Sequence, residues 1–362
     1  MPLSPIRTTA GLAFLSGLLT AAAPLAPNET LPGPWSPNKP VQANQAINVN
    51  QGCVGCHEEI AAEWQASLHA EAYTNPEFQR ALHEEPLPFC KGCHAPEADP
   101  KKADHSALQR LGVSCVSCHV VKLGILASPG GTGSTDNPTH PVVRQASFAT
   151  LAACANCHQF AFPGESETMA YNLMQSTINE FRVTSDDASG CAVCHMPVTA
   201  TGHRSHRFDV TRNASRLRAA LRVSARRNGH HRVEISLASK AVAHAFPTGD
   251  LFRRLAVEVE ALGPEFSQVE AHTLYLAREF ETTHTEGGVK RRRLVRDARL
   301  PAGGQARALV FEWDNDISKV PIHFRVVYQR VQHPGKVGQP DAEIAGELEL
   351  ASGELAVEGH EP

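Results

Sequence analysis

All ten cysteines of this chain fall into five copies of the pattern Cys-x-x-Cys-His. This pattern is the attachment signature of c-type haem, because its two thiols can bond to the two vinyl groups of one porphyrin. The histidine that follows is then carried under the iron as an axial ligand. The cysteines predicted to bind haem are Cys53 with Cys56, Cys90 with Cys93, Cys115 with Cys118, Cys154 with Cys157, and Cys191 with Cys194.

Each motif also ends in one predicted proximal iron ligand. Two other uses of the cysteines have to be weighed: two pairs can share a zinc ion, and ten cysteines in an exported chain can form five disulfides. Neither explains a histidine directly after every pair with no cysteine left over. The sequence therefore predicts five covalently bound haems, with proximal ligands His57, His94, His119, His158 and His195.

Each iron can take a second, distal ligand, and most of the 19 histidines lie outside the motifs. His69 lies near the end of a helix predicted over residues 58–73. On a continuous helix it lies roughly 18 Å along the axis from His57. Two ligands of one iron lie only a few ångströms apart, so we expect His69 to bind an iron other than that of His57. The alternative is a polar residue at a helix end.

The other candidate distal ligands lie in loop or turn sequences, where a side chain is free to reach inward. His140 follows a Gly-rich loop, His206 lies in SHRF, and His244 lies in the turn HAFPTGD. A ligand at His244 would dock the C-terminal part onto the haems, and the alternative is a turn histidine bonded to the backbone. For the fifth iron His83, His105 and His203 compete, with His105 slightly favoured. Thioether ligation by Met169 or Met174 is less favoured than a packing role.

The change of pattern along the chain predicts an α+β protein with two lobes. We predict a signal peptide over 1–26, a Pro- and Asn-rich arm over 27–50, a pentahaem domain of short helices and loops over 51–209, and an antiparallel β-sandwich over 210–362. The predicted helices are 58–73, with apolar residues at i, i+4 and i+8, and 168–181. The predicted strands alternate at period two and lie at 217–225, 231–239, 253–262, 272–281, 307–314, 322–331 and 346–352.

The N-terminal sequence and the charge indicate where the chain works. Arg7 precedes an apolar stretch from Gly11 to Ala22, followed by small residues, which is typical of a cleaved secretory signal. A retained anchor is the alternative, but the stretch is shorter than the about 20 residues of a spanning helix. We therefore expect an exported bacterial protein, in the periplasm or on the outer cell surface. The net charge is −4, and a basic run at 290–293 is expected to be a solvated strand edge or turn rather than a nucleic-acid site.

The motifs of the first lobe resemble the cytochrome c-554 family of multihaem cytochromes. The resemblance is carried by CHEEIAAEWQASLHA at 56–70, by the CHAP and GVSCVSCH motifs, by CANCHQF, and by CAVCHMPVTATGHRSHRF. The turn HAFPTG resembles the start of a C-terminal module on some members. The resemblance implies His69 and His206 as distal ligands, mostly bis-histidine irons, and closely stacked haems. This chain has five motifs and the founding member has four, so the pairing of haems does not transfer.

Two functions fit these patterns. The first is electron transfer between redox partner proteins, either other cytochromes or a membrane quinol-linked donor, because irons with two protein ligands bind no substrate. The second is an oxidoreductase that acts on a small nitrogen or sulfur species or a peroxide at one five-coordinate haem. It needs an open iron and nearby proton donors. A spectrum of the ferric protein distinguishes the two.

Overall fold

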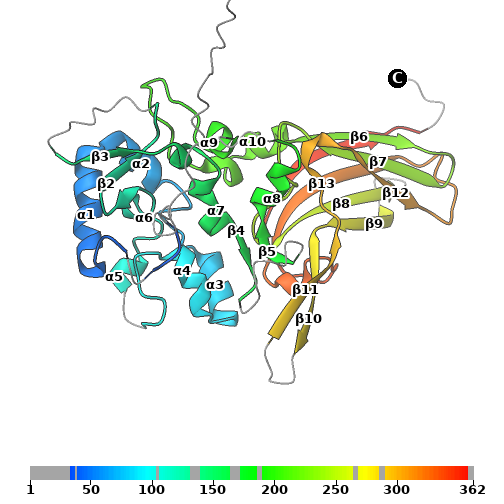
Figure 1. Cartoon of the computed structure of the whole chain (residues 1–362). Coiled ribbons are helices and arrows are strands. Elements are labelled where there is room, and N and C mark those ends of the chain that lie inside the picture. The colour runs from blue at the N-terminus through cyan, green and yellow to red at the C-terminus, as the bar shows by residue number, and fades with distance from the viewer. Residues whose placement is uncertain are drawn as a thin grey trace, which may run out of the picture. The chain divides into compact units, whose positions relative to one another are not determined.

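The computed structural model describes residues 33–36, 39–102, 106–130, 139–163, 172–185, 190–263, 268–284 and 290–357. The predicted signal peptide and His105 lie outside these residues. Residues Leu31–Pro362 form one compact unit, so the predicted boundary at residue 210 stays a prediction. The chain up to residue 219, here called the first part, contains the helices, and the chain from residue 221 on, the second part, contains the long strands. Together they confirm the α+β class (Figure 1).

Every Cys-x-x-Cys-His motif lies at the C-terminal end of a helix. The first histidine, His57, caps α1, and the other four histidines end their helices. Positions i and i+3 lie on one face of a helix, so both thiols of a motif point to the same side. The helices of this part are α1 (Ala43–Cys56), α2 (Glu58–Gln65), α3 (Pro76–Glu84), α4 (Pro88–His94), α5 (Ser106–Gln109), α6 (Cys115–His119), α7 (Ala152–His158), α8 (Thr177–Arg182), α9 (Gly190–His195) and α10 (Ala214–Ala219).

The helix predicted over 58–73 is wrong in its second half, because α2 ends at Gln65. Beyond it, the carbonyl of His69 accepts hydrogen bonds from the backbone N–H of Val113, at 2.8 Å, and of Ala72. That carbonyl therefore does not take the i+4 partner that a continuing helix requires. Gly112, at φ +60°, lies against the carbonyls of His69 and Ala70, and a side chain there would clash with both. A long-range backbone contact thus places His69 in a turn.

The helix predicted over 168–181 is confirmed from Thr177, where α8 begins, and is wrong before it. Residues Leu173–Ser176 form strand β5, which pairs antiparallel with β4 (Gln159–Ala161). The first part of the chain contains a second small sheet that was not predicted, made of β1 (Val120–Val121), β2 (Gly124–Ala127) and β3 (Val142–Arg144). Strands β1 and β4 start directly after the motif histidines His119 and His158.

The second part contains two larger antiparallel sheets and a hairpin. One sheet has the order β14-β13-β8-β9 and the other the order β12-β7-β6, while β10 and β11 pair only with each other. Figure 1 shows the hairpin extending beyond the ends of the other strands. The strands are β6 (Leu221–Arg227), β7 (Arg232–Ser239), β8 (Arg253–Leu262), β9 (Gln268–Leu276), β10 (Arg278–His284), β11 (Lys290–Asp297), β12 (Arg307–Glu312), β13 (Ile322–Val331) and β14 (Ile344–Leu355).

Buried side chains of both larger sheets belong to one hydrophobic cluster. Ile235 of β7, Val257 of β8 and Val326 of β13 are fully buried members of it. Alternate residues of each strand contribute to this shared core, as the period-two pattern predicts. The antiparallel sheets are confirmed, and the shared core supports the sandwich arrangement, which remains a prediction.

Two predicted strands need correction. The segment 217–225 begins as α10, because the side chain of Asn213 accepts a hydrogen bond from the N–H of Arg216 at 3.1 Å and caps a helix there. The segment 272–281 is two strands, divided at the fully buried Ala277. The expectation of a solvated strand edge for the basic run 290–293 is confirmed, because it lies within β11 of the two-stranded hairpin and Arg293 pairs with Glu281 across it.

Candidate haem-binding site

Four pairs of histidine rings lie at nearly equal separation, and every pair includes a histidine of a haem motif. The ring centroids are 6.4 Å apart for His57 and His140, 6.1 Å for His69 and His158, 6.2 Å for His119 and His206, and 6.3 Å for His195 and His244. In every pair one histidine comes from a Cys-x-x-Cys-His motif and the other from a distant segment. The four partners are the residues predicted as distal ligands, apart from His105.

The separation of the rings fits one metal ion between each pair. A metal–imidazole bond is about 2 Å long and the ring nitrogen lies a further ~1.2 Å from the centroid, so two imidazoles on opposite sides of one ion have centroids roughly 6.4 Å apart. The donor set and its spacing therefore suit an iron with two axial histidines.

Hydrogen bonds orient several of these imidazoles. Four Nδ1 atoms lie at hydrogen-bond distance from backbone carbonyls: that of His94 is 2.6 Å from Ala72, that of His119 is 2.8 Å from Leu126, that of His206 is 2.8 Å from Arg204, and that of His244 is 2.9 Å from Ala245. In His158, Nδ1 lies 3.1 Å from the side-chain amide of Gln175. A proton donated from Nδ1 leaves Nε2 with its lone pair free for a metal.

Burial keeps the same rings neutral. Burial lowers the pKa of His69 to about 3, with the neighbouring His158 and His195 lowering it further. Burial and then the facing histidine lower the pKa of His195 and of His206 to about 4. The pKa values of His94, His119, His158 and His244 are also lowered, in each case mainly by burial. A neutral imidazole is the form that binds metal.

Six of the ten thiols form contacts between different motifs. The thiol of Cys53 hydrogen-bonds that of Cys115, Cys93 bonds Cys157, and Cys154 bonds Cys191. No cysteine forms a disulfide, and the described residues contain no cluster of three or more side chains suited to a metal ion. The disulfide and zinc alternatives therefore find no support in the described part of the chain.

His94 differs from the other four motif histidines. Its ring stacks on Phe78 with centroids 3.7 Å apart and planes 8° from parallel, and no ring contact with an imidazole is found for it among the described residues. Phe78 is held there by α3, whose N-terminus is capped by Asn75 through bonds from the N–H groups of Glu77 and Phe78. Phe78 lies against the flat face of the imidazole, which leaves the Nε2 edge uncovered by this contact.

The three candidates for a fifth distal ligand have different positions. His203 makes hydrogen bonds with both ring nitrogens, from Nε2 to Glu63 at 3.2 Å and from Nδ1 to the hydroxyls of Thr199 and Thr201. His83 lines an open groove of about 420 Å³ with His333 and Gln332, and has no imidazole ring contact among the described residues. His105 lies outside the described residues. The first two are therefore not paired with His94.

A buried carboxylate that sequence reasoning missed holds the segment of His206. Glu63 is 7% exposed, accepts the N–H of His206 at 2.8 Å and contacts Nε2 of His203. Burial acts to raise the pKa of Glu63, but the bonds from His206 and His203 outweigh it and the pKa lies below its usual value. In the sequence Glu63 is one of several glutamates in α2, and nothing marks it as the buried one.

Replacing Glu63 with leucine is expected to destabilise the protein by about 1–3 kcal/mol, because the N–H of His206 then loses its acceptor. Thermal unfolding of the holoprotein measures the change. Glu59→Gln is the control, since the Glu59 side chain is 62% exposed and also lies near His203. Equal melting temperatures for the two variants would show that Glu63 does not support this segment.

The second part of the chain contributes His244 and a set of charged contacts to the first. Arg299 donates to Glu180 of α8 at 2.8 Å, Thr248 donates to the same carboxylate at 2.6 Å, and Arg330 of β13 pairs with Glu77 of α3 at 2.7 Å. Asn172 also bonds the backbone of Arg292 and Leu294 in β11. These contacts link α3, which carries Phe78 beside His94, and α8 to the second part, including the turn that contains His244.

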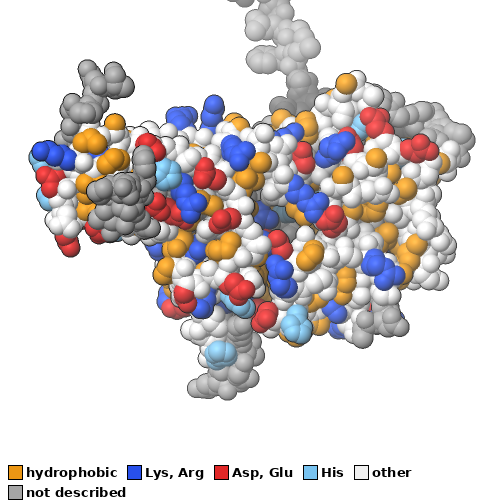
Figure 2. Space-filling model, turned by 180° about the vertical axis from the view of Figure 1, so that it is seen from behind, with side chains coloured by type: hydrophobic (Ala, Val, Ile, Leu, Met, Phe, Trp, Pro, Cys, Tyr) orange, Lys and Arg blue, Asp and Glu red, His pale blue; other side chains and the backbone are white. Residues whose placement is uncertain are grey.

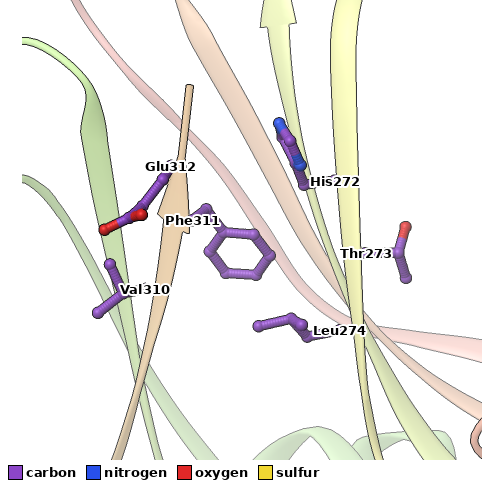
Figure 3. Close-up of a pocket in the computed structure, with 6 residues that line it drawn as sticks. All are labelled: His272, Thr273, Leu274, Val310, Phe311 and Glu312. Atoms are coloured by element: carbon purple, nitrogen blue, oxygen red, sulfur yellow. The ribbon is translucent and has the colours of Figure 1, made fainter. Parts of the chain in front are cut away.

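A groove within the β-sheets lies apart from the motifs. It has a volume of about 400 Å³ and lies between the edge strands β9 and β12, where Leu274 and Phe311 point toward each other (Figure 3). Its lining includes His272 but no residue of a Cys-x-x-Cys-His motif and no member of the four histidine pairs. The candidate site is therefore the set of histidine pairs.

Two comparisons with known proteins found a match. Residues 36–207, which include all five motifs, match the family of outer membrane cytochrome MtrC/MtrF-like proteins, domains II/IV. The fold resembles a solved penta-heme cytochrome c552 from Thermochromatium tepidum, with a TM-score of 0.65, 19% sequence identity, and coverage of 88% of this chain and 100% of that one. No curated protein matches the sequence. The family match over residues 36–207 and the five repeated haem motifs support a multihaem c-type cytochrome.

Proposed function

We propose that this chain carries electrons between redox partner proteins through five covalently bound haems, four of them with two axial histidines. The observation that supports this best is the set of four histidine pairs with centroids 6.1–6.4 Å apart. When bound, haem supplies one-electron chemistry at its iron. Two imidazoles on one iron leave no position for a substrate. The side chains therefore suit electron transfer rather than catalysis at these four positions.

The contacts between thiols support an order for the electron path. Each thiol bonds to a porphyrin edge when haem is attached, so two thiols in contact bring two porphyrin edges together. The first motif contacts the third through Cys53 and Cys115, and the fourth contacts the second through Cys157 and Cys93. Cys154 contacts Cys191 and so joins the fourth motif to the fifth, and Cys157 of the fourth motif interacts electrostatically with Cys118 of the third. We expect a path from the first motif through the third to the fourth, with branches to the second and fifth.

The partners we propose are other cytochromes or a membrane quinol-linked donor, and the place is the bacterial periplasm or outer cell surface. The matched family consists of outer membrane cytochromes, and the described helices lack the length and hydropathy of a membrane crossing. On the face in Figure 2, acidic and basic side chains are interspersed. Docking on that face is therefore expected to depend only weakly on ionic strength, because no large single-sign patch steers the partner there.

One observation favours a second function at a single position. His94 has Phe78 against its ring and no imidazole contact among the described residues. An iron held there by one histidine would be open to a small nitrogen or sulfur species or a peroxide. The second candidate function is therefore an oxidoreductase acting at the motif of residues 90–94, with the other four motifs delivering electrons.

Carbon monoxide distinguishes the two functions. If the His94 iron is open, the ferric protein is expected to show one high-spin haem in five, and the same fraction binds carbon monoxide after reduction. Absorption and electron paramagnetic resonance spectra measure both fractions. A fully low-spin protein that does not respond to carbon monoxide would contradict the second function and leave electron transfer. In that case His105→Ala tests the remaining ligand candidate, because it should create the missing carbon monoxide site.

A further inference from the structure

The fourth motif, at residues 154–158, is the one most surrounded by the others. Its two thiols hydrogen-bond thiols of two different motifs, Cys93 and Cys191. The histidine facing His158 is His69, whose pKa is lowered by desolvation and by the neighbouring His158, His195, His206 and His94. In the path proposed above, every electron that changes branch passes this position. The reduction potential at this position therefore affects every transfer between branches.

The Nδ1 atom of His158 has a different kind of hydrogen-bond partner from the Nδ1 atoms of four other candidate iron ligands. The Nδ1 atoms of His94, His119, His206 and His244 face backbone carbonyls, which every residue type supplies. The Nδ1 of His158 faces the side-chain amide of Gln175 at 3.1 Å. Among these five rings, only that of His158 has a partner whose chemistry depends on the identity of one side chain.

The position of Gln175 is fixed from both sides. It lies on β5 opposite Phe160 of β4, and β4 starts directly after His158. The guanidinium of Arg278, at the start of β10, donates to the carbonyls of Leu173 and Met174 on the same strand. The ladder and the arginine together leave β5 little freedom to shift along His158.

The amide of Gln175 can act as an acceptor. An imidazole that binds a metal through Nε2 keeps its proton on Nδ1 and donates it. Turning the amide by 180° exchanges Nε2 for Oε1 at the same place, and the hydrogen-bond network decides between the two. The oxygen therefore faces Nδ1 when an iron is bound. A stronger acceptor makes the imidazole a stronger donor to the metal and favours the ferric form.

We propose that Gln175 is a positioning residue that sets the reduction potential of the iron held by His158 and His69, through its hydrogen bond to Nδ1 of His158. The inference rests on the proposed electron-transfer function and deepens it. The step involved is a one-electron change between ferric and ferrous iron, with the electron arriving from or leaving to a neighbouring motif. No bond breaks, and the proton stays on Nδ1.

Two substitutions are expected to move this potential in opposite directions. Gln175→Leu removes the acceptor, so the ferrous form becomes more stable relative to the ferric form and the reduction potential rises. Gln175→Glu supplies a charged acceptor, so the potential falls. We expect each to change the ferric-to-ferrous equilibrium at one iron by at least tenfold, which is about 59 mV for a one-electron couple. Gln332→Leu is the matched control, because Gln332 pairs with Glu343 at the surface.

The experiment is a spectroelectrochemical titration of the holoprotein with electron paramagnetic resonance at each stage. The proposal predicts that one of the resolved potentials moves upward in Gln175→Leu and downward in Gln175→Glu, with every haem attached and the control unchanged. Shifts of the same sign in both variants would indicate a merely structural role and overturn it, as would no shift at all. If Gln175→Leu does not fold, the sign of the shift in Gln175→Glu decides. Absence of haem at the fourth motif in the unmodified protein would instead contradict the proposed function itself.

Discussion

Replacing His69 with alanine is expected to convert one iron from low spin to high spin while all five haems stay attached. The ring of His69 lies 6.1 Å from that of His158. Without it, the iron of His158 loses its second strong ligand but keeps both thioethers and the proximal histidine. The reduced variant is expected to gain one carbon monoxide site.

Ferric absorption and paramagnetic resonance spectra measure the spin state, and the mass of the intact chain counts the haems. His231→Ala is the control, because His231 is exposed in the second part and its ring hydrogen-bonds the backbone carbonyl of Asn315. A His69→Ala protein that remained as low-spin as the control would mean that another residue holds this iron.

Replacing Arg299 with methionine is expected to cost about 3–5 kcal/mol of stability, because it leaves the largely buried carboxylate of Glu180 without its cation. The Arg299 side chain is 5% exposed and that of Glu180 11%, and Arg299 also holds Asp297 and the carbonyl of Pro247. Pro247 lies three residues after His244. We therefore also expect the pair of His195 and His244 to loosen and one iron to become partly high-spin.

Denaturant unfolding of the holoprotein measures the stability, and the same sample gives the spin state. Arg293→Met is a matched control, since the Arg293 and Glu281 side chains are 68% and 43% exposed and exposed ion pairs contribute about 0–1 kcal/mol. If Arg299→Met is no less stable than Arg293→Met, the buried contact does not join the two parts of the chain.

The same buried contact predicts a loss of stability in acid. Burial acts to raise the pKa of Glu180 and of Asp297, but Arg299 and the hydrogen bonds outweigh it, so both pKa values lie below their usual range. A carboxyl group with a lowered folded-state pKa stabilises the fold above its unfolded pKa of about 4 and loses that contribution as the pH falls through the folded value. The decrease in melting temperature between pH 6 and pH 3 should be smaller in Arg299→Met than in the unmodified protein. Equal decreases would contradict this assignment.

The haem motifs and most of their expected partners could be predicted from the sequence because the chemistry is local. Two thiols and a histidine within five residues are sufficient to indicate one haem. His140, His206 and His244 were predicted from loop positions, and His69 from a helix that in fact ends at Gln65. The argument that separated His69 from His57 assumed a continuous helix, and although the helix ends early, the ring of His69 faces that of His158.

Features that depend on long-range contacts could not be predicted. Strand β5 was expected to be helical, and its pairing with β4 and the bonds from Arg278 are visible only in the fold. Glu63 and Gln175 are common residue types in unremarkable sequence, and only their contacts with His206 and His158 distinguish them. The β-strands were predicted well where one face is buried, and poorly at the hairpin of β10 and β11, where most residues of β11 are solvated.

The central claim is that all five motifs carry covalent haem and that the adjoining histidines hold the irons. The mass of the mature polypeptide, produced in a host competent for haem attachment, tests it most directly. The account predicts the mass of the polypeptide plus five haems, retained after denaturation. A mass with fewer than five haems, or a colourless product without added porphyrin, would contradict it.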